Sequence, residues 1–204
     1  MPGRNSHSWE LILAGMTATF LAGALWWQGD ILGVAGAKPA AELLIVAILF
    51  VLYPDVDCRR WTWRLLFVLA LATLALVFTW IAVFAWGRTR FVDIHSVETP
   101  IILVTLLGGV VITPIFEEKV VRDLLLRGLN QMAGPVISTL LVSLAFALAH
   151  HGSMVWTFIV SISLCVMALR WRVSTLQRAV VHGLMNLLIY LWYGTYGYGL
   201  FDVQ

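Results

Sequence analysis

Seven long apolar runs dominate this chain and restrict how it can fold. They cover residues 10–28, 39–54, 61–86, 98–115, 134–151, 153–170 and 176–193. A helix that crosses a bilayer needs about 20 mostly apolar residues, within a range of about 17–25. Only 12% of the residues are charged, against about 25% in soluble domains. The sequence therefore predicts an all-α, polytopic transmembrane helical bundle of about seven spans, within a range of six to eight.

The basic residues predict how this bundle is oriented. With the N-terminus inside, ten of the 13 Lys and Arg residues fall on the inner side, and Lys38, Arg88 and Arg90 fall on the outer side. Cytoplasmic loops carry an excess of Lys and Arg. The distribution predicts an integral membrane protein with a cytoplasmic N-terminus, and the compact size indicates a prokaryotic cell (inner) membrane. The amphipathic segment 115–131 would change the count if it dipped into the membrane.

Composition also limits the organisation and the partners of the chain. We expect one integral membrane domain over residues 1–204, with spans of no distinctive pattern in 1–97 and all the polar motifs in 98–204. The net charge of +2 says little about partners, and nothing in the sequence indicates nucleic-acid binding. Cys58 and Cys165 form no CxxC motif or disulfide framework, so both are expected to be free thiols.

The segment Phe116–Arg122 places two adjacent carboxylates inside this apolar sequence. Ionisable groups are costly at membrane depth and usually mark function there. Arg122 follows Glu118 by four residues, so the two can pair along a helix. Glu117 points about 100° away and has no such partner, which suits a general base. Pro114 should bend or start this helix. The alternative is an ordinary charged helix end at the cytoplasmic surface.

Two further polar patterns follow in the later spans. Phe146 and His150 form an FxxxH pattern at the end of one apolar run. His182 and Asn186 are four residues apart, so both project from one face of the last span. A neutral histidine and an asparagine amide can each donate a hydrogen bond to a developing oxyanion. Alternatively, His150 is an interfacial residue and the last pair is a polar clamp between helices.

A zinc site is the main rival chemistry. Glu117, His150 and His182 could supply the three protein ligands of a catalytic zinc. The HExxH pattern and the other compact zinc signatures are absent, as are GxSxG, P-loop and GxGxxG motifs. The same residues also work without a metal, since Glu117 and His150 can polarise a water molecule. We therefore expect no metal and no cofactor.

The ordered set EExxxR, FxxxH and HxxxN resembles the CPBP family of membrane proteins, the CAAX-protease and bacteriocin-processing or Rce1-type proteins. The resemblance covers about Ile112 to Ile189. It implies a glutamate-dependent intramembrane endopeptidase in which Glu117 and His150 activate water. By the same resemblance His182 and Asn186 stabilise the oxyanion, and Glu118 and Arg122 position the site or the substrate. A hairpin around Gly134-Pro135 would bring Glu117 and His150 to a similar depth.

The resemblance implies a peptide substrate, either a membrane protein or a lipidated peptide, within the lipid bilayer. Neither the substrate nor the residues that bind it can be read from the sequence. The main alternative is a non-catalytic membrane protein, such as an immunity or scaffold protein, that uses the polar cluster structurally. A zinc-dependent membrane protease is the third reading. The three differ in how they respond to Glu117→Gln and to chelation.

Overall fold

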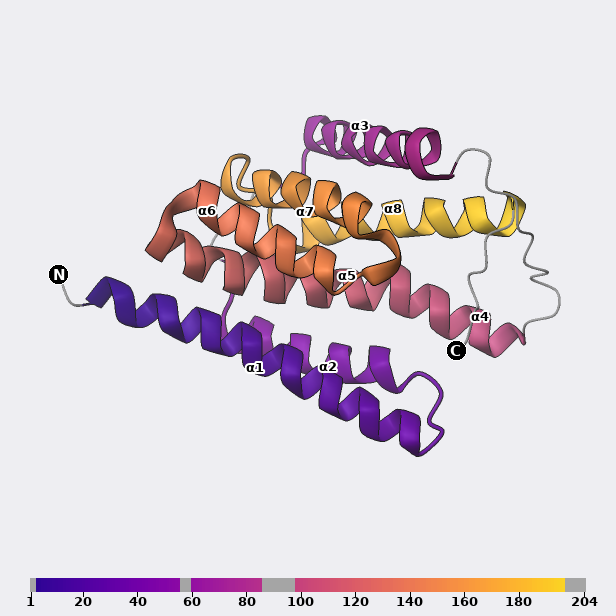
Figure 1. Ribbon diagram of the computed structural model, residues 1–204, viewed down its shortest axis with the longest axis horizontal. Coiled ribbons are helices and arrows are strands. Elements are labelled where there is room, and N and C mark those ends of the chain that lie inside the picture. The colour runs from indigo at the N-terminus through magenta and orange to yellow at the C-terminus, as the bar shows by residue number, and fades with distance from the viewer. Residues whose placement is uncertain (1–2, 56–59, 86–97, 197–204) are drawn as a thin grey trace.

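The computed structural model describes residues 3–55, 60–85 and 98–196, and within these ranges all regular secondary structure is helical (Figure 1). The first half contains α1 (Gly3–Ile31), α2 (Ala37–Leu52), α3 (Trp63–Trp80) and the π-helical turn η1 (Ile81–Ala85). The second half contains α4 (Thr99–Leu106), η3 (Leu107–Ile112), α5 (Thr113–Glu117), η4 (Glu118–Leu125), α6 (Leu126–Leu148), η5 (His151–Ser153), α7 (Met154–Leu169) and α8 (Thr175–Tyr196).

The elements from α4 to the first part of α6, residues 99–133, form one continuous helix that contains two wide π-type turns, η3 and η4. Pro114 lies in the first turn of α5, directly after η3. Proline has no backbone N–H, so Pro114 cannot donate to the carbonyl of Val110 four residues earlier. The wider turn accommodates this missing bond within the helix. The expected span 98–115 therefore ends too early, because the segment 115–131 continues the same helix.

The chain reverses direction inside α6, at Gly134. This residue has φ 80° and ψ 171°, a backbone conformation that residues with a Cβ rarely adopt. Pro135 follows and cannot donate a helical hydrogen bond. The hairpin that a dipping 115–131 segment would form around these two residues is therefore present. It returns the chain along the helix that carries Glu117 and brings His150 back toward it.

Two apolar clusters hold the bundle together on either side of this long helix. In Figure 1, α1 and α2 lie on one side of it and α3 lies on the other, with the helix axes roughly along the long direction of the molecule. Leu11, Ile45 and Val120 belong to the cluster that joins α1, α2 and η4. Leu69 and Leu164 belong to the cluster that joins α3, α7 and α8.

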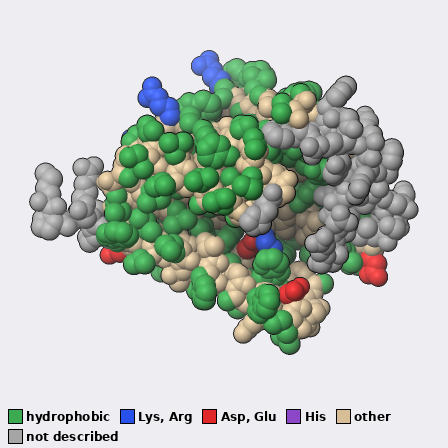
Figure 2. Space-filling model, in the orientation of Figure 1, with side chains coloured by type: hydrophobic (Ala, Val, Ile, Leu, Met, Phe, Trp, Pro, Cys, Tyr) green, Lys and Arg blue, Asp and Glu red, His purple; other side chains and the backbone are tan. Residues whose placement is uncertain are grey.

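The outer surface of the bundle is apolar, whereas several charged side chains are buried. Phe20, Val51 and Val136 are 75%, 80% and 70% exposed, and hydrophobic side chains cover most of the face seen in Figure 2. By length and composition, three described helices could cross a membrane: His7–Ile31, Trp63–Val83 and Thr99–Leu148, the last containing the reversal. This arrangement, with lipid as the solvent, is that of an integral membrane protein.

The structure tests the predicted free-thiol state for one of the two cysteines. Cys165 is a buried free thiol in α7, as expected. Cys58 lies outside the described residues, so its state stays a prediction. The outer basic residues Arg88 and Arg90 also lie outside the described residues.

Candidate active site

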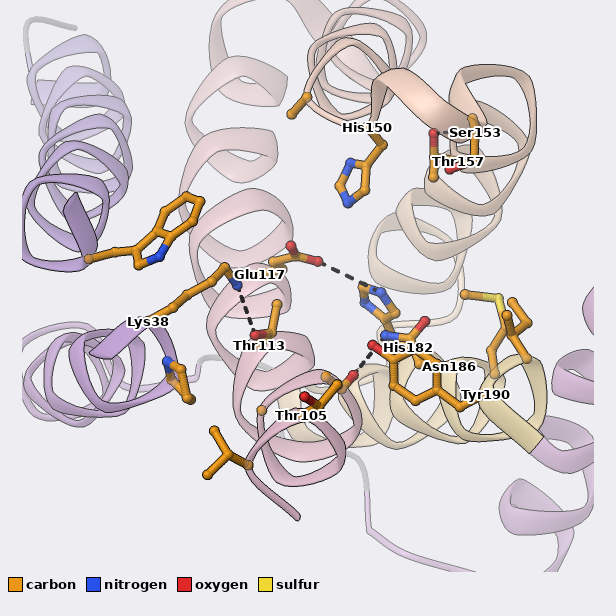
Figure 3. Close-up of a pocket in the computed structure, with 18 of the residues that line it drawn as sticks. Lys38, Thr105, Thr113, Glu117, His150, Ser153, Thr157, His182, Asn186 and Tyr190 are labelled. Atoms are coloured by element: carbon orange, nitrogen blue, oxygen red, sulfur yellow. Dashed lines mark hydrogen bonds and ion pairs between the residues drawn. The ribbon is translucent and has the colours of Figure 1, made fainter. Parts of the chain in front are cut away.

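Four residues expected to carry chemistry line a single cavity of about 900 Å³. Glu117 comes from the end of α5, His150 from the turn after α6, and His182 and Asn186 from α8. Figure 3 shows Glu117, His150 and His182 pointing toward one another across this cavity. The reversal at Gly134 therefore brings together residues that are distant in the sequence. Its volume lies within the range of about 300–1,000 Å³ that is usual for ligand sites.

Glu117 faces His182. The distance between Oε2 of Glu117 and Nε2 of His182 is 3.7 Å. The two side chains are 19% and 6% exposed, so both lie near the wall of the cavity. A contact of this length is too long for a hydrogen bond, so Oε2 of Glu117 can still accept one from water in the cavity. The sequence predicted that Glu117 would have no partner on its own helix, and its neighbour in space comes instead from α8.

Glu118 is fully buried and is surrounded by hydrogen-bond donors. Its Oε1 accepts from Nη1 of Arg122 at 3.0 Å, which confirms the predicted pair along the helix. Its Oε2 accepts from Nε of Arg178 at 3.1 Å. Nδ1 of His182 lies 3.3 Å from Oε1 of Glu118. This buried carboxylate thus fixes the position of His182 through a network that leaves its own charge fully paired.

Arg178 is the residue of this network that sequence reasoning missed. It lies four residues before His182, on the same face of α8, and it is 4% exposed. Besides Glu118, its guanidinium donates to the carbonyl of Val173 and to Oγ1 of Thr175. The four-residue spacing was visible in the sequence. Nothing in the sequence separated Arg178 from the exposed arginines that precede it.

The FxxxH pattern has a local structural explanation. Nδ1 of His150 lies 2.7 Å from the backbone carbonyl of Phe146, which can only accept, so Nδ1 carries the hydrogen. The two aromatic rings also lie against each other, with centroids 4.5 Å apart. In the neutral ring Nε2 is then an unprotonated acceptor. Figure 3 shows the ring of His150 directed into the cavity, where this nitrogen can accept from water.

Asn186 is held at a close crossing between α8 and η3. Its Nδ2 donates to the carbonyl of Gly109 at 2.8 Å, which leaves its second amide hydrogen available. The two helices are so close here that a Cβ added to Gly183 would lie 2.1 Å from the carbonyl oxygen of Val110. That carbonyl is the one that Pro114 cannot bond. The absence of a side chain at Gly183 therefore lets α8 approach the helix that carries Glu117.

Further polar residues in the wall of the cavity were not predicted. Nζ of Lys38 donates to Oε1 of Glu42 at 2.6 Å and to Oγ1 of Thr113 at 3.1 Å. Tyr190 lies one turn after Asn186 on α8, and its hydroxyl packs against Gly109. Lys38 and Glu42 belong to α2, so the first half of the chain also contributes to the site. The motifs of the second half contain no signal for these residues.

The rival zinc reading lacks a grouped set of ligands among the described residues. No three or more His, Cys, Asp or Glu side chains in the described part of the chain are grouped closely enough to hold a metal ion. Nδ1 of His182 is directed at Glu118, and Nδ1 of His150 at a carbonyl. The arrangement instead presents one carboxylate, two imidazole nitrogens and an amide hydrogen to a shared space. Such groups can activate water and stabilise an oxyanion.

Comparison with known proteins identifies the part of the chain that holds this site. Residues 99–188 match the family model described as type II CAAX prenyl endopeptidase Rce1-like. These residues are an Rce1-like family domain. The family is one of peptidases, which are hydrolases. No curated protein and no solved structure matches the chain.

The Rce1-like domain contains all six residues singled out from the sequence: Glu117, Glu118, Arg122, His150, His182 and Asn186. The predicted resemblance to this family is thus confirmed. Arg178 also lies within the domain, whereas Lys38 and Glu42 lie before it. The domain therefore supplies the chemistry-bearing groups, and α1 and α2 complete one wall of the cavity.

Proposed function

We propose that this protein is an intramembrane endopeptidase in which Glu117 is the general base. The observation that carries the proposal is the shared cavity. Carboxylate, imidazole and amide groups from three separate elements line it, and Glu117 and His182 face each other at 3.7 Å. Membership of the domain in a peptidase family supports the same reaction class.

In the proposed reaction, Glu117 takes one proton from a water molecule, and Nε2 of His150 accepts a hydrogen bond from the O–H group that remains. The oxygen of that water attacks the carbonyl carbon of the substrate peptide bond. Glu117 then gives the proton to the leaving nitrogen as the C–N bond breaks. General acid–base catalysis of this kind contributes roughly 10²–10⁴-fold to a rate. Every proton in this scheme passes through groups that line the cavity.

The oxyanion that forms needs donors, and α8 supplies them. The second amide hydrogen of Asn186 is one, since the first is used on Gly109. His182 is the other, and Nε2 is its donor, because Nδ1 already faces Glu118. Glu118, Arg122 and Arg178 act as positioning residues, since they reach the reacting atoms only through His182.

We also propose that the chain crosses the membrane seven times. Seven helical segments run alternately in opposite directions: α1, α2, α3, 99–133, 135–148, α7 and α8. In this topology the N-terminus is cytoplasmic, because the end that carries most basic residues then faces the cytoplasm. The substrate is a membrane-associated or lipid-modified peptide, which reaches the cavity from the bilayer.

The test is the comparison of new peptide termini in membranes from cells that express wild type or Glu117→Gln at matched levels. The substitution keeps the size of the side chain and removes its ability to accept a proton. We expect termini produced by the wild type to fall about 10²–10⁴-fold with the variant. Glu10→Gln is the matched control, since Glu10 is an exposed carboxylate, 64% accessible, in α1.

The outcomes separate the alternatives. Identical termini from wild type and Glu117→Gln, with both proteins folded, would contradict proteolysis and favour a scaffold or immunity protein. In that case Glu118 and Arg122 should matter more than Glu117, because they form the buried network. A zinc-dependent protease would instead lose its termini on chelation and regain them with added zinc.

A further inference from the structure

A second, smaller cavity of about 210 Å³ lies where α7 ends and α8 begins. Four arginines line it: Arg122, Arg127, Arg172 and Arg178. Arg122 is 2% exposed, and its Nε is a buried side-chain nitrogen with no hydrogen-bond partner among the described residues. A buried donor left unpaired costs about 1–3 kcal/mol. The wall of this cavity therefore includes a buried guanidinium whose hydrogen bonding is incomplete.

Positive charge exceeds negative charge in and around this cavity. Asp55 and Asp123 also line it, but both already have cationic partners. Lys119 donates to both carboxylates, and Nη1 of Arg127 lies 3.2 Å from Asp123. With Glu118 included, five basic side chains share three carboxylates: Lys119, Arg122, Arg127, Arg172 and Arg178 against Asp55, Glu118 and Asp123. The excess is two positive charges, which favours a bound anion.

Arg172 is held at this cavity by an unusual backbone. It has φ 50°, in the left-handed region that residues with a Cβ adopt at a cost. It lies in the turn between α7 and α8, and no hydrogen bond or ion pair joins it to another described residue. The turn thus places a guanidinium without a carboxylate partner in the wall of a basic cavity.

The surroundings place this cavity at the depth of lipid head groups. Asp55 follows the end of α2, and its carboxylate accepts hydrogen bonds from the backbone N–H and the hydroxyl of Thr175 at the start of α8. The end of α2 and the start of α8 therefore meet at this cavity. Trp171 is next to Arg172 and is 41% exposed. Two more tryptophans follow Asp55 in the chain, Trp61 and Trp63 at the start of α3, and they are 50% and 73% exposed. Tryptophan gathers at the interface between membrane and water. Basic side chains at that level meet anionic head groups.

We propose that this cavity binds a phosphate group, either the phosphodiester of an anionic lipid head group or a free phosphate ion. Guanidinium groups bind phosphate oxygens through paired N–H donors, so Arg172 and Arg127 are its main ligands. Arg122 and Arg178 line the inner wall and contact Glu118 on the other side. The anion therefore adds negative charge next to the network that holds His182.

The experiment measures binding to the purified full-length protein in a neutral detergent. Thermal unfolding is followed while inorganic phosphate, or a short-chain phosphatidylglycerol, is titrated at constant ionic strength. A ligand that binds only the folded state raises the unfolding temperature with its concentration. The cavity variant is Arg127→Gln with Arg172→Asn, where asparagine tolerates the left-handed backbone. The matched control is Arg64→Gln with Arg170→Gln, two arginines that do not line the cavity.

The measured quantity is the concentration of the phosphate compound that gives half of the maximal rise in unfolding temperature. We expect this concentration to increase at least tenfold in the cavity variant and to stay unchanged in the control variant. A response to phosphatidylglycerol alone assigns the site to a lipid head group, and a response to both assigns it to phosphate in general. No response of the wild type to either compound overturns the proposal, as does an equal loss in both variants. The readout involves no proteolysis, so it stands apart from a failure of the proposed reaction.

Discussion

Two adjacent glutamates have opposite surroundings in this protein. Glu118 is fully buried and contacts two arginines and a histidine, whereas Glu117 lies at the wall of a cavity and faces His182 at 3.7 Å. The cause is geometric, since successive side chains on a helix point about 100° apart. A carboxylate whose pairing is complete positions its neighbours. A carboxylate with an open side can exchange a proton with water.

At the scale of the residue, we expect Arg178→Met to destabilise the protein by more than the loss of van der Waals contacts alone, because the substitution also removes a charge that pairs with Glu118. Glu118 would keep Arg122 but lose one of its two arginines, and removal of one partner of a buried ion pair costs about 3–5 kcal/mol. Thermal unfolding in detergent measures this, with Arg170→Met as the matched control on an exposed arginine. An equal unfolding temperature for the two variants would show that Arg178 is dispensable to the network.

At the scale of elements, the site depends on how closely α8 approaches the long helix. Pro114 leaves the carbonyl of Val110 without its helical donor, and Gly183 offers no side chain at the point where α8 passes that carbonyl. One turn after Gly183 on α8, Asn186 donates a hydrogen bond to the backbone carbonyl of Gly109. The helical irregularity at η3 and the small residues of α8 therefore act together. They set the separation between Glu117 and His182.

Gly183→Ala tests this crossing. The added Cβ would lie 2.1 Å from the backbone oxygen of Val110, which cannot move aside as a side chain would. We expect α8 to shift outward, with a loss of about 1–3 kcal/mol in stability and a loss of peptidase activity. Unfolding in detergent and the yield of new peptide termini measure the two effects.

The matched control for this crossing is Gly23→Ala in α1, where a Cβ meets nothing within 4 Å. Alanine favours a helix over glycine by about 0.5–1 kcal/mol, so this variant should be slightly more stable than wild type. If Gly183→Ala behaved like Gly23→Ala, the close approach of α8 would have no role in the site.

At the scale of the whole molecule, the exterior is apolar and the charges lie inside. Water drives apolar side chains inward, but lipid does not, so a membrane protein can expose them and reserve its interior for polar groups. Lys119 is fully buried and pairs with Asp55 and Asp123, which ties the chain after α2 to η4. Asp55 also bonds to Thr175, and so fastens the start of α8. Buried ion pairs thus connect the two halves of the bundle.

The proposed seven crossings predict that the two ends of the bundle lie on opposite sides of the membrane. In a background without Cys58 and Cys165, Arg170→Cys and Asp30→Cys each introduce one thiol at an exposed position. An impermeant thiol reagent added outside intact cells should label the thiol at position 30 and not that at position 170. Permeabilised cells provide the control, because both thiols should then react. Labelling of position 170 alone from outside would reverse the orientation.

Much of the site could be predicted because its local geometry follows from short spacings. Glu118 and Arg122 pair because residues four apart on a helix share a face, and His182 and Asn186 share a face for the same reason. The apolar runs fixed the all-α class, and the hairpin at Gly134-Pro135 followed from residues that end helices. These features depend on the chain within a few turns, so the sequence contains them.

Only the tertiary structure decided which distant groups meet. Arg178 joins Glu118, and Lys38 enters the cavity wall beside Thr113, through contacts between helices that no short spacing encodes. The helix that carries Glu117 also continues past residue 115, because η3 and η4 accommodate Pro114 and the charged residues inside the bundle instead of ending it. In the sequence, the charged residues of this segment have the pattern of a solvent-exposed helix face. In the structure they are buried, and partners from other helices pair with them.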